Sequence, residues 1–327
     1  MRDRIQIVGG GPAGASAALA ALREGVSVHV FEKSRFPRHK VCGEFLSPGI
    51  LRVLGDFGLT GAFDALGPAP VKRAMLCFGR REKNFRLPEI AWGLSRAAFD
   101  HLLLRAAEER GAVVTHSTPT SFDKPVVVAR GRHFASTASD RGQRLFGFKA
   151  HFRADAGDAV ELYFFNGCYV GLNAVEDGLT NVCGIAPERL LARFGFEHDE
   201  LLQSCEPLRA RLQGAERIMP WLSTGPLRFE NRFRVDPEPG VYAAGDALSF
   251  VDPFTGSGLL AALKTGTMAG RFAARERPVQ EYMESVRAVL ERPFAIAGIF
   301  RWAVTSGWAE RIAPLLPGAA MFRWTRP

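Results

Sequence analysis

A strand-like run at residues 4–8 leads into a glycine-rich turn with the spacing Gly9-x-Gly11-x-x-Gly14, and an alanine-rich stretch follows. In this pattern Gly9 permits a tight turn, Gly11 lets backbone approach a pyrophosphate, and Gly14 lets the helix pack closely on the strand. Glu32 ends the next apolar run, where an acidic side chain accepts hydrogen bonds from ribose hydroxyls. The sequence therefore predicts a βαβ unit that binds a dinucleotide whose adenosine has no 2′-phosphate.

The rest of the chain alternates between two patterns. Helical periodicity at 95–110, with Ser95 as a possible N-cap, and an apolar run at 241–246 before a helix at 257–274 extend the parallel α/β pattern. Between 145 and 185, short apolar segments separated by turn residues predict an antiparallel sheet. We expect an α/β fold in which a Rossmann-like dinucleotide-binding domain carries a discontinuous antiparallel β-sheet substrate domain and C-terminal helices. The expected boundaries are 1–70, 91–144 and 232–277 for the first domain, 71–90 and 145–231 for the second, and 278–327 for the helices.

Composition excludes several classes of protein. The net charge of +8 is spread along the chain rather than clustered, which argues against a nucleic-acid partner. The five cysteines contain no C-x-x-C pair, so we expect no metal site, no disulfide framework and a reducing cytoplasmic location. No spanning helix is predicted, although a C-terminal stretch with interspersed tryptophans and arginines leaves peripheral membrane contact open.

A second motif, VYAAGDALSFVDPFTGSG at 241–258, resembles the third FAD motif of the p-hydroxybenzoate hydroxylase-like flavoproteins. The resemblance implies that the dinucleotide is FAD, so the first domain is expected to be an FAD-binding domain. It also implies that Asp246 binds the ribityl or pyrophosphate end, that Pro253 lies beside the isoalloxazine, and that 256–258 present N–H groups to its pyrimidine edge. A glycine-rich turn that opens a helix suits the negative charge of a reduced flavin.

A third motif, FPRHKVCGEFLSPG at 36–49, is similar to a segment of geranylgeranyl reductase-like enzymes and, with its Cys-Gly-Glu replaced, of flavin-dependent halogenases. The resemblance implies that Cys42 lies near the flavin. Cys42 is a candidate catalytic thiol that donates a proton, or it is only a small buried side chain. Arg96, in LSRAAFDHLL, resembles an arginine of the family's helix beside FAD, with an ordinary solvated arginine as the alternative. The expected cofactor-binding residues are Gly9, Gly11, Pro12, Ala13, Gly14, Glu32, Lys33, Arg38, Lys40, Cys42, Gly43, Arg96, Gly245, Asp246, Pro253, Thr255, Gly256, Ser257 and Gly258.

Two departures from the family pattern bear on the electron donor. Family members carry Asp-Gly where this chain has Arg130-Gly131, and only about ten residues replace a small β-meander before 126–129. The sequence also holds no second GxGxxG motif. NAD(P)H is expected as a transient donor, and Arg130 places that use in doubt.

The leading expectation is an FAD-dependent oxidoreductase of the geranylgeranyl reductase-like group that reduces a C=C bond of a hydrophobic isoprenoid or polyketide-type substrate. Candidates for an apolar lining are Phe146, Phe148, Phe152, Phe164, Phe165 and Tyr169. Alternate strand positions face opposite sides, so many of them are expected to be core residues instead. One alternative is a flavin-dependent monooxygenase or halogenase-like enzyme acting through a flavin hydroperoxide, although the W-x-W-x-I-P signature of tryptophan halogenases is absent. The other alternative is a degenerate flavin-binding protein without catalysis.

Overall fold

The structure is a computed structural model of the chain. It describes residues 4–132, 144–155, 157–227, 237–250 and 256–305.

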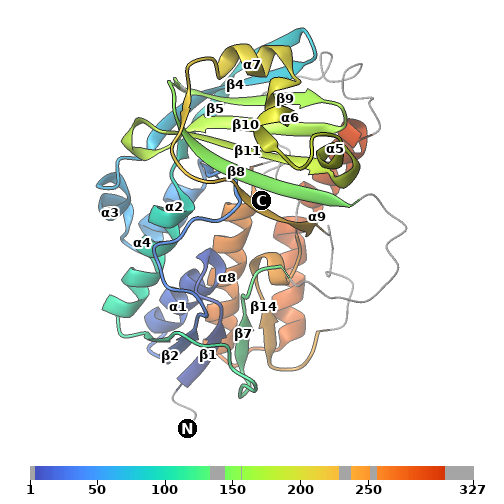
Figure 1. The fold of residues 1–327 in the computed structure, drawn as a ribbon. Helices are drawn as coiled ribbons and strands as arrows, with labels where there is room; N and C mark the ends of the chain where they lie inside the picture. Colours follow the sequence, from blue (N-terminus) through green and yellow to red (C-terminus); the bar gives the residue numbers. More distant parts are fainter. Residues whose placement is uncertain (1–3, 133–143, 156, 228–236, 251–255, 306–327) are drawn as a thin grey trace.

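A parallel five-stranded sheet forms the lower layer in Figure 1. The strand order is β14 (Val241–Ala243), β7 (Val126–Val128), β1 (Arg4–Val8), β2 (Ser27–Phe31) and β6 (Val113–Thr115). These strands come from widely separated stretches of the sequence, as predicted. Short apolar strands that are buried among helices are typical of a doubly wound α/β domain. The expected α/β fold with a Rossmann-like dinucleotide-binding domain is confirmed.

Helices α1 (Pro12–Arg23) and α8 (Gly258–Ala274) lie side by side next to this sheet (Figure 1). Their close approach depends on two glycines in α8. A Cβ at Gly266 would lie 2.1 Å from Ala13 O, and a Cβ at Gly270 would lie 2.2 Å from Ala17 O. The tight packing places the N-termini of both helices at the same edge of the sheet. Helix α4 (Arg96–Glu109) also packs on α1, and the Ser95 side chain caps it by accepting a hydrogen bond from Ala98 N at 3.1 Å, as predicted.

A nine-stranded, mainly antiparallel sheet forms the upper layer (Figure 1). Its order is β12 (Glu216–Arg217), β8 (Leu145–Arg153), β11 (Thr180–Pro187), β10 (Cys168–Ala174), β9 (Ala159–Phe165), β4 (Ala69–Phe78), β5 (Arg81–Gly93) and β3 (Phe45–Leu46), and β13 (Leu222–Leu227) also pairs with β8. The residues of 116–125, which connect β6 to β7, contain no strand.

Three short helices cover the outer face of this sheet: α5 (Glu188–Arg193), α6 (His198–Gln203) and α7 (Glu206–Arg211). Phe148 and Phe152 are buried beneath them in one hydrophobic core, and Phe146 and Phe165 pack against the same core. Because successive strand residues face opposite sides, the odd-numbered residues of β8 point the other way, toward the FAD-binding domain. Of the six aromatic candidates, these four therefore belong to the core, as expected for many of them, and only Tyr169 lines the cavity described below.

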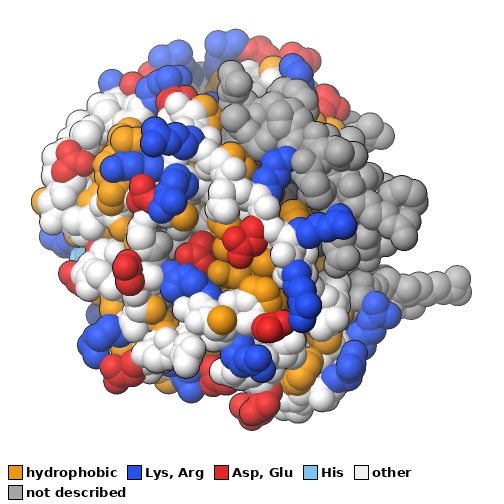
Figure 2. Space-filling view, turned by 90° about the horizontal axis from the view of Figure 1, so that it is seen from above, with side chains coloured by type: hydrophobic (Ala, Val, Ile, Leu, Met, Phe, Trp, Pro, Cys, Tyr) orange, Lys and Arg blue, Asp and Glu red, His pale blue; other side chains and the backbone are white. Residues whose placement is uncertain are grey.

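The remaining elements are α2 (Ile50–Asp56), α3 (Thr60–Asp64), α9 (Val279–Thr305) and the short 3-10 helices Glu176–Gly178 and Gly245–Ala247. Among the described helices, none combines the length and apolarity that a bilayer crossing requires. On the face shown in Figure 2, basic side chains occur in several separate groups with acidic side chains between them.

Candidate active site

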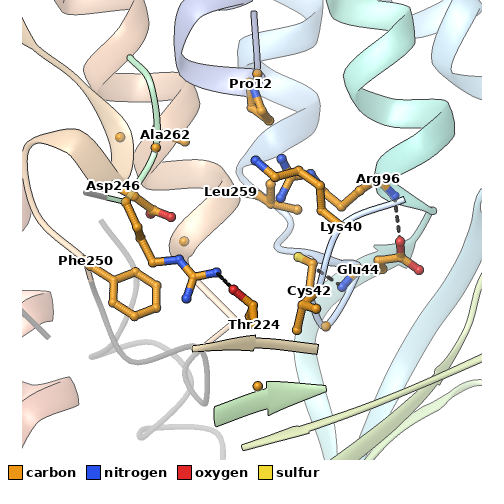
Figure 3. A pocket seen from close by; sticks show the side chains of 18 of the residues that line it. Pro12, Lys40, Cys42, Glu44, Arg96, Thr224, Asp246, Phe250, Leu259 and Ala262 are labelled. Atoms are coloured by element: carbon orange, nitrogen blue, oxygen red, sulfur yellow. Dashed lines mark hydrogen bonds between the residues drawn. The ribbon is translucent and has the colours of Figure 1, made fainter. Parts of the chain in front are cut away.

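A cavity of about 530 Å³ lies between the carboxyl ends of the parallel strands and the inner face of the nine-stranded sheet. It extends from the glycine-rich turn after β1 to side chains of β4, β9, β10 and β11. Ligands of open α/β sheets bind at the carboxyl ends of the strands. The cavity therefore joins the predicted dinucleotide site to the second sheet in one continuous space (Figure 3).

The tight turn at Gly9 and the close helix packing at Gly14 are as predicted, and the position of Gly11 suits the role predicted for it. Gly9 has a φ of +105°, and a Cβ there would lie 2.4 Å from Ala129 O on β7's end. A Cβ at Gly14 would lie 1.7 Å from Gly9 O, so the helix packs directly on the turn. At Gly11, by contrast, a Cβ would meet nothing within 4 Å, and the residue lines the cavity. The turn thus leaves open backbone beside the α1 N-terminus, where a diphosphate fits.

Glu32 lies at the end of β2, and its carboxylate is fixed by backbone donors. Gly10 N donates to Oε2 at 2.7 Å and Ser34 N donates to Oε1 at 2.8 Å. The side chain lines the cavity while the residue is only 5% exposed. Carboxylate oxygens have further lone pairs, so the geometry leaves Glu32 able to accept ribose hydroxyls.

Positive charge gathers in the cavity beside the glycine-rich turn. Arg38 Nε is buried and, among the described residues, has no hydrogen-bond partner. Burial, with a contribution from neighbouring Arg96, lowers the pKa of Lys40 to about 8, and the Lys40 side chain lies next to Arg96 in Figure 3. A buried guanidinium nitrogen without a partner and a destabilised ammonium both favour a bound anion.

Arg96 is held at the cavity wall by a buried ion pair. Its Nε and Nη2 donate to the two oxygens of Asp100, each at 2.6 Å, and Asp100 is fully buried. Asp100 raises the pKa of the guanidinium against the opposing effect of burial, and the thiol of Cys42 also contacts the guanidinium. The alternative of an ordinary solvated arginine is wrong for this structure.

Cys42 is half-buried and lines the cavity. Its Sγ accepts a hydrogen bond from Glu44 N at 3.4 Å, and its carbonyl oxygen accepts one from Asn181 Nδ2 at 3.2 Å. The segment that carries Lys40 and Cys42 is therefore attached to β11. The thiol is consequently placed within the cavity, and its proximity to a flavin stays a prediction.

Opposite Cys42, Asp246 lies on another part of the wall (Figure 3). Arg132 also lines the cavity. Burial raises the pKa of the Asp246 carboxyl, and Arg132, Lys40 and Arg96 oppose that rise. Arg132 Nη2 donates to Thr224 Oγ1 at 3.3 Å, and its guanidinium lies 4.9 Å from the centroid of the Phe250 ring. This wall combines one carboxyl with a stacked cation.

Most of the predicted cofactor residues meet in the cavity. Those that line it are Gly9, Gly11, Pro12, Ala13, Glu32, Lys33, Arg38, Lys40, Cys42, Gly43, Arg96, Gly245, Asp246, Gly256 and Gly258. Gly14 and Ser257 are buried and are not among the lining residues. Pro253 and Thr255 lie outside the described residues.

The remaining wall is mainly apolar. Ala74, Leu76, Phe85, Val160, Leu162 and Ile185 supply it from strands β4, β5, β9 and β11. Strand alternation could have suggested Leu76 and Leu162 as lining residues. The face of the sheet that points into the cavity, however, is determined by the position of the other domain. A flat apolar ring system fits such a wall beside the cationic groups.

Sequence reasoning missed Arg132, Glu44, Lys149 and His151. Glu44 stood within the quoted third motif without an assigned role, and nothing local connects it to two residues more than 100 positions later. The side chains of His39, Glu44 and His151 each bring one atom of a type that can bind metal within 4.8 Å of the others. The expectation of no metal site stays a prediction. That expectation considered cysteine spacing and could not detect a cluster built from separate segments.

Comparisons with known proteins agree with a dinucleotide-binding site in this cavity. Residues 3–127 match the family described as FAD binding domain. A 1H-pyrrole-2-carbonyl-[peptidyl-carrier protein] brominase of Pseudoalteromonas luteoviolacea is 26% identical over 312 residues, which cover 81% of this chain and 75% of that protein. A solved flavin-dependent brominase superposes with a TM-score of 0.77 at 19% identity, covering 98% of this chain and 92% of that one. A geranylgeranyl bacteriochlorophyll reductase-like protein of Thermoplasma acidophilum gives 0.71 at 18% identity, covering 98% and 89%.

The chain is therefore a flavin-dependent enzyme of the oxidoreductase type with an FAD-binding domain. The residues that would hold FAD are those of the cavity: Gly11 and the α1 N-terminus for the diphosphate, and Glu32 for the ribose. The expectation of an FAD-dependent flavoprotein is confirmed. The sequence relatives favour the halogenase alternative over the geranylgeranyl reductase-like group.

Proposed function

We propose that this chain is a flavin-dependent halogenase-type enzyme that modifies an electron-rich aromatic group of a hydrophobic substrate. Bound reduced FAD would supply two electrons to dioxygen, and bromide or chloride would be oxidised in the process. The observation that carries the proposal is the brominase similarity over 81% of the chain, together with one continuous cavity that joins the glycine-rich turn to an apolar wall.

The chain's own residues would bind and orient the reactants. Lys40, Arg38 and Arg96 would balance the negative charge of the diphosphate and of the reduced flavin. Leu76, Leu162 and their apolar neighbours would exclude water and receive an aromatic ring.

The residues of the cavity wall also bear on the source of electrons for the flavin. Arg130 lines the cavity at the position where the family pattern has aspartate, Arg132 lines it two residues later, and the sequence holds one GxGxxG motif. We propose that reduced flavin comes from a separate reductase, so that NADH or NADPH alone would reduce the bound FAD poorly.

A second candidate is reduction of a C=C bond, and the placement of Cys42 favours it. The thiol lies in the cavity against Arg96 and could donate the proton that completes hydride delivery from a reduced flavin. In that case a polyprenyl or polyketide alkene would accept electrons without oxygen.

The test begins with FAD-loaded protein reduced photochemically without air. One sample receives oxygenated buffer with bromide and a pyrrole or phenol, and the other receives a polyprenyl alkene under strict anaerobiosis. The proposal expects a product with the bromine isotope doublet in the first sample, dependent on both bromide and oxygen. Anaerobic reoxidation by the alkene, abolished by Cys42→Ala, would instead support the reductase. An oxygenated product without bromine would show that the enzyme is a monooxygenase.

A further inference from the structure

Positive charge faces the middle of the cavity from two sides. Lys40 and Arg96 lie on one side (Figure 3). Asp246 and Phe250 lie on the other side (Figure 3). Arg132 belongs to this second side, because its guanidinium lies 4.9 Å from the centroid of the Phe250 ring. A ligand in the space between them therefore meets cations from both directions.

The guanidinium of Arg132 is held in place by two different contacts. Its Nη2 donates to Thr224 Oγ1 at 3.3 Å, and its plane lies over the Phe250 ring. A guanidinium carries five N–H donors, and among the residues that the structure describes Arg132 makes this one hydrogen bond. Burial lowers the pKa of Arg132, while Asp246 and Cys42 oppose that change. The side chain is thus a desolvated and oriented cation with donors left for a ligand.

The carboxyl groups of this region do not balance its cations. Arg96 already has Asp100 as its partner. Asp246 interacts with both Arg132 and Lys40, and burial raises the pKa of its carboxyl against their effect. One carboxyl therefore serves two further cations, and an excess of positive charge remains. Such an excess, removed from water, favours a bound anion.

Two other features add positive potential on the same side. The 17-residue helix α8 begins at Gly258, which lines the cavity, so the positive end of its dipole faces the ligand space. Arg130 lines the cavity as well, at the position where the resembling flavoproteins carry an aspartate. A negative charge of the family pattern is thus replaced by a positive one, and Arg132 follows two residues later.

We propose that Arg132 makes this cavity bind reduced FAD more tightly than oxidised FAD. Reduction adds two electrons and one proton to the flavin, so the reduced ring carries one more negative charge than the oxidised ring. A fixed guanidinium attracts that extra charge and has much less effect on the neutral ring. The inference rests on FAD binding, but it does not rest on the choice between halogenation and alkene reduction. It implies that the chain takes up reduced FAD and releases oxidised FAD.

The test measures the midpoint potential of bound FAD by equilibration with a redox dye, together with the dissociation constant of oxidised FAD. A wild type that binds the reduced form at least about tenfold more tightly will have a potential about 30 mV or more above that of free FAD. Arg132→Gln should lose about 10- to 100-fold of this preference, which lowers the potential by about 30 to 60 mV. The affinity for oxidised FAD should change less than about threefold.

Equal losses of affinity for both forms, with an unchanged potential, would overturn the proposal, because they indicate a structural role. A wild-type potential at or below that of free FAD would overturn it too. Arg132→Lys keeps the charge and should retain more than half of the preference. A lysine variant as low in potential as Arg132→Gln would contradict a role of the charge. The matched control is Arg153→Gln, at an exposed pair with Glu216 on β8, which should keep the wild-type potential.

A halide ion is the other anion that this charge could bind. The potential is therefore also measured in bromide and in gluconate of equal ionic strength, and the proposal predicts the same value in both. A wild-type potential that bromide lowers, with no such effect in Arg132→Gln, would overturn the proposal in favour of a halide site. These measurements contain no organic substrate, so a failure to find brominated product would leave their outcome unaffected.

Discussion

Arg96 and Asp100 form a two-pronged ion pair one turn apart on α4, with both N···O distances at 2.6 Å and Asp100 fully buried. The pair fixes the guanidinium that contacts Cys42, so the wall of the cavity depends on a carboxylate that does not line it. Asp100 is thus a positioning residue for this wall of the cavity.

Replacing Asp100 by alanine should destabilise the protein by about 3–5 kcal/mol, because Arg96 would remain buried without its counter-charge. The measurement is urea unfolding followed by circular dichroism. Arg105→Ala is a control on the same helix, since its pairs with Glu108 and Glu109 are exposed and should contribute about 0–1 kcal/mol. Equal effects of the two substitutions would contradict the assignment.

The packing of α1 on α8 predicts a steric effect at Gly270. A Cβ in Gly270→Ala would lie 2.2 Å from Ala17 O, so the helices must separate, and we expect a loss of about 1–3 kcal/mol. Gly61→Ala, in α3, meets nothing within 4 Å and should leave the thermal midpoint unchanged or slightly raised. A Gly270→Ala protein as stable as wild type would show that the helices are less tightly packed.

Glu32→Ala should weaken FAD binding by roughly 10- to 100-fold, because the ribose loses a charged acceptor and two backbone donors lose theirs. Quenching of flavin fluorescence on titration gives the dissociation constant. Glu24→Ala removes a carboxylate that pairs with Arg275 at the surface, and it should bind FAD like wild type. Wild-type affinity in Glu32→Ala would place the ribose elsewhere.

Lys40 predicts how FAD affinity depends on pH. Its pKa of about 8 in the cofactor-free protein lies below the ordinary lysine value, so the ammonium is present at lower pH and is lost as the pH rises through 8. The dissociation constant for FAD should therefore increase above pH 8, by up to about tenfold per pH unit. The same lowered pKa makes folding more favourable as the pH rises from 8 toward the unfolded-state value, because the unfolded chain binds more protons.

Lys40→Met should weaken FAD binding at neutral pH and flatten this dependence. Lys72→Met, at an exposed position of β4, should retain the wild-type profile. If Lys40→Met still shows the rise above pH 8, another group is responsible.

Much of the FAD-binding half could be predicted from the sequence because its signals are local. One turn and one strand end are encoded by the spacing of Gly9, Gly11 and Gly14 and by the distance to Glu32. In the structure the glycines form the turn between β1 and α1, and Glu32 follows the end of β2. Ser95, as an N-cap residue, likewise predicted the start of α4.

The second sheet was harder to predict because its faces are assigned by the partner domain. Phe148 and Lys149 are neighbours in the sequence, and strand alternation alone does not say which of the two faces the substrate side. Helices α5–α7 cover the Phe148 face, so the lysine faces inward and needs Glu44 as its counter-charge. A contact across 105 positions leaves no periodic signal in either segment.

The most direct test of the central claim is a crystal structure of the protein with bound FAD. The account predicts the diphosphate at Gly11 and the α1 N-terminus, the adenosine ribose at Glu32, and the isoalloxazine in the cavity between Cys42 and Arg132. A flavin bound outside this cavity, or protein that takes up no FAD at saturating concentration, would contradict it.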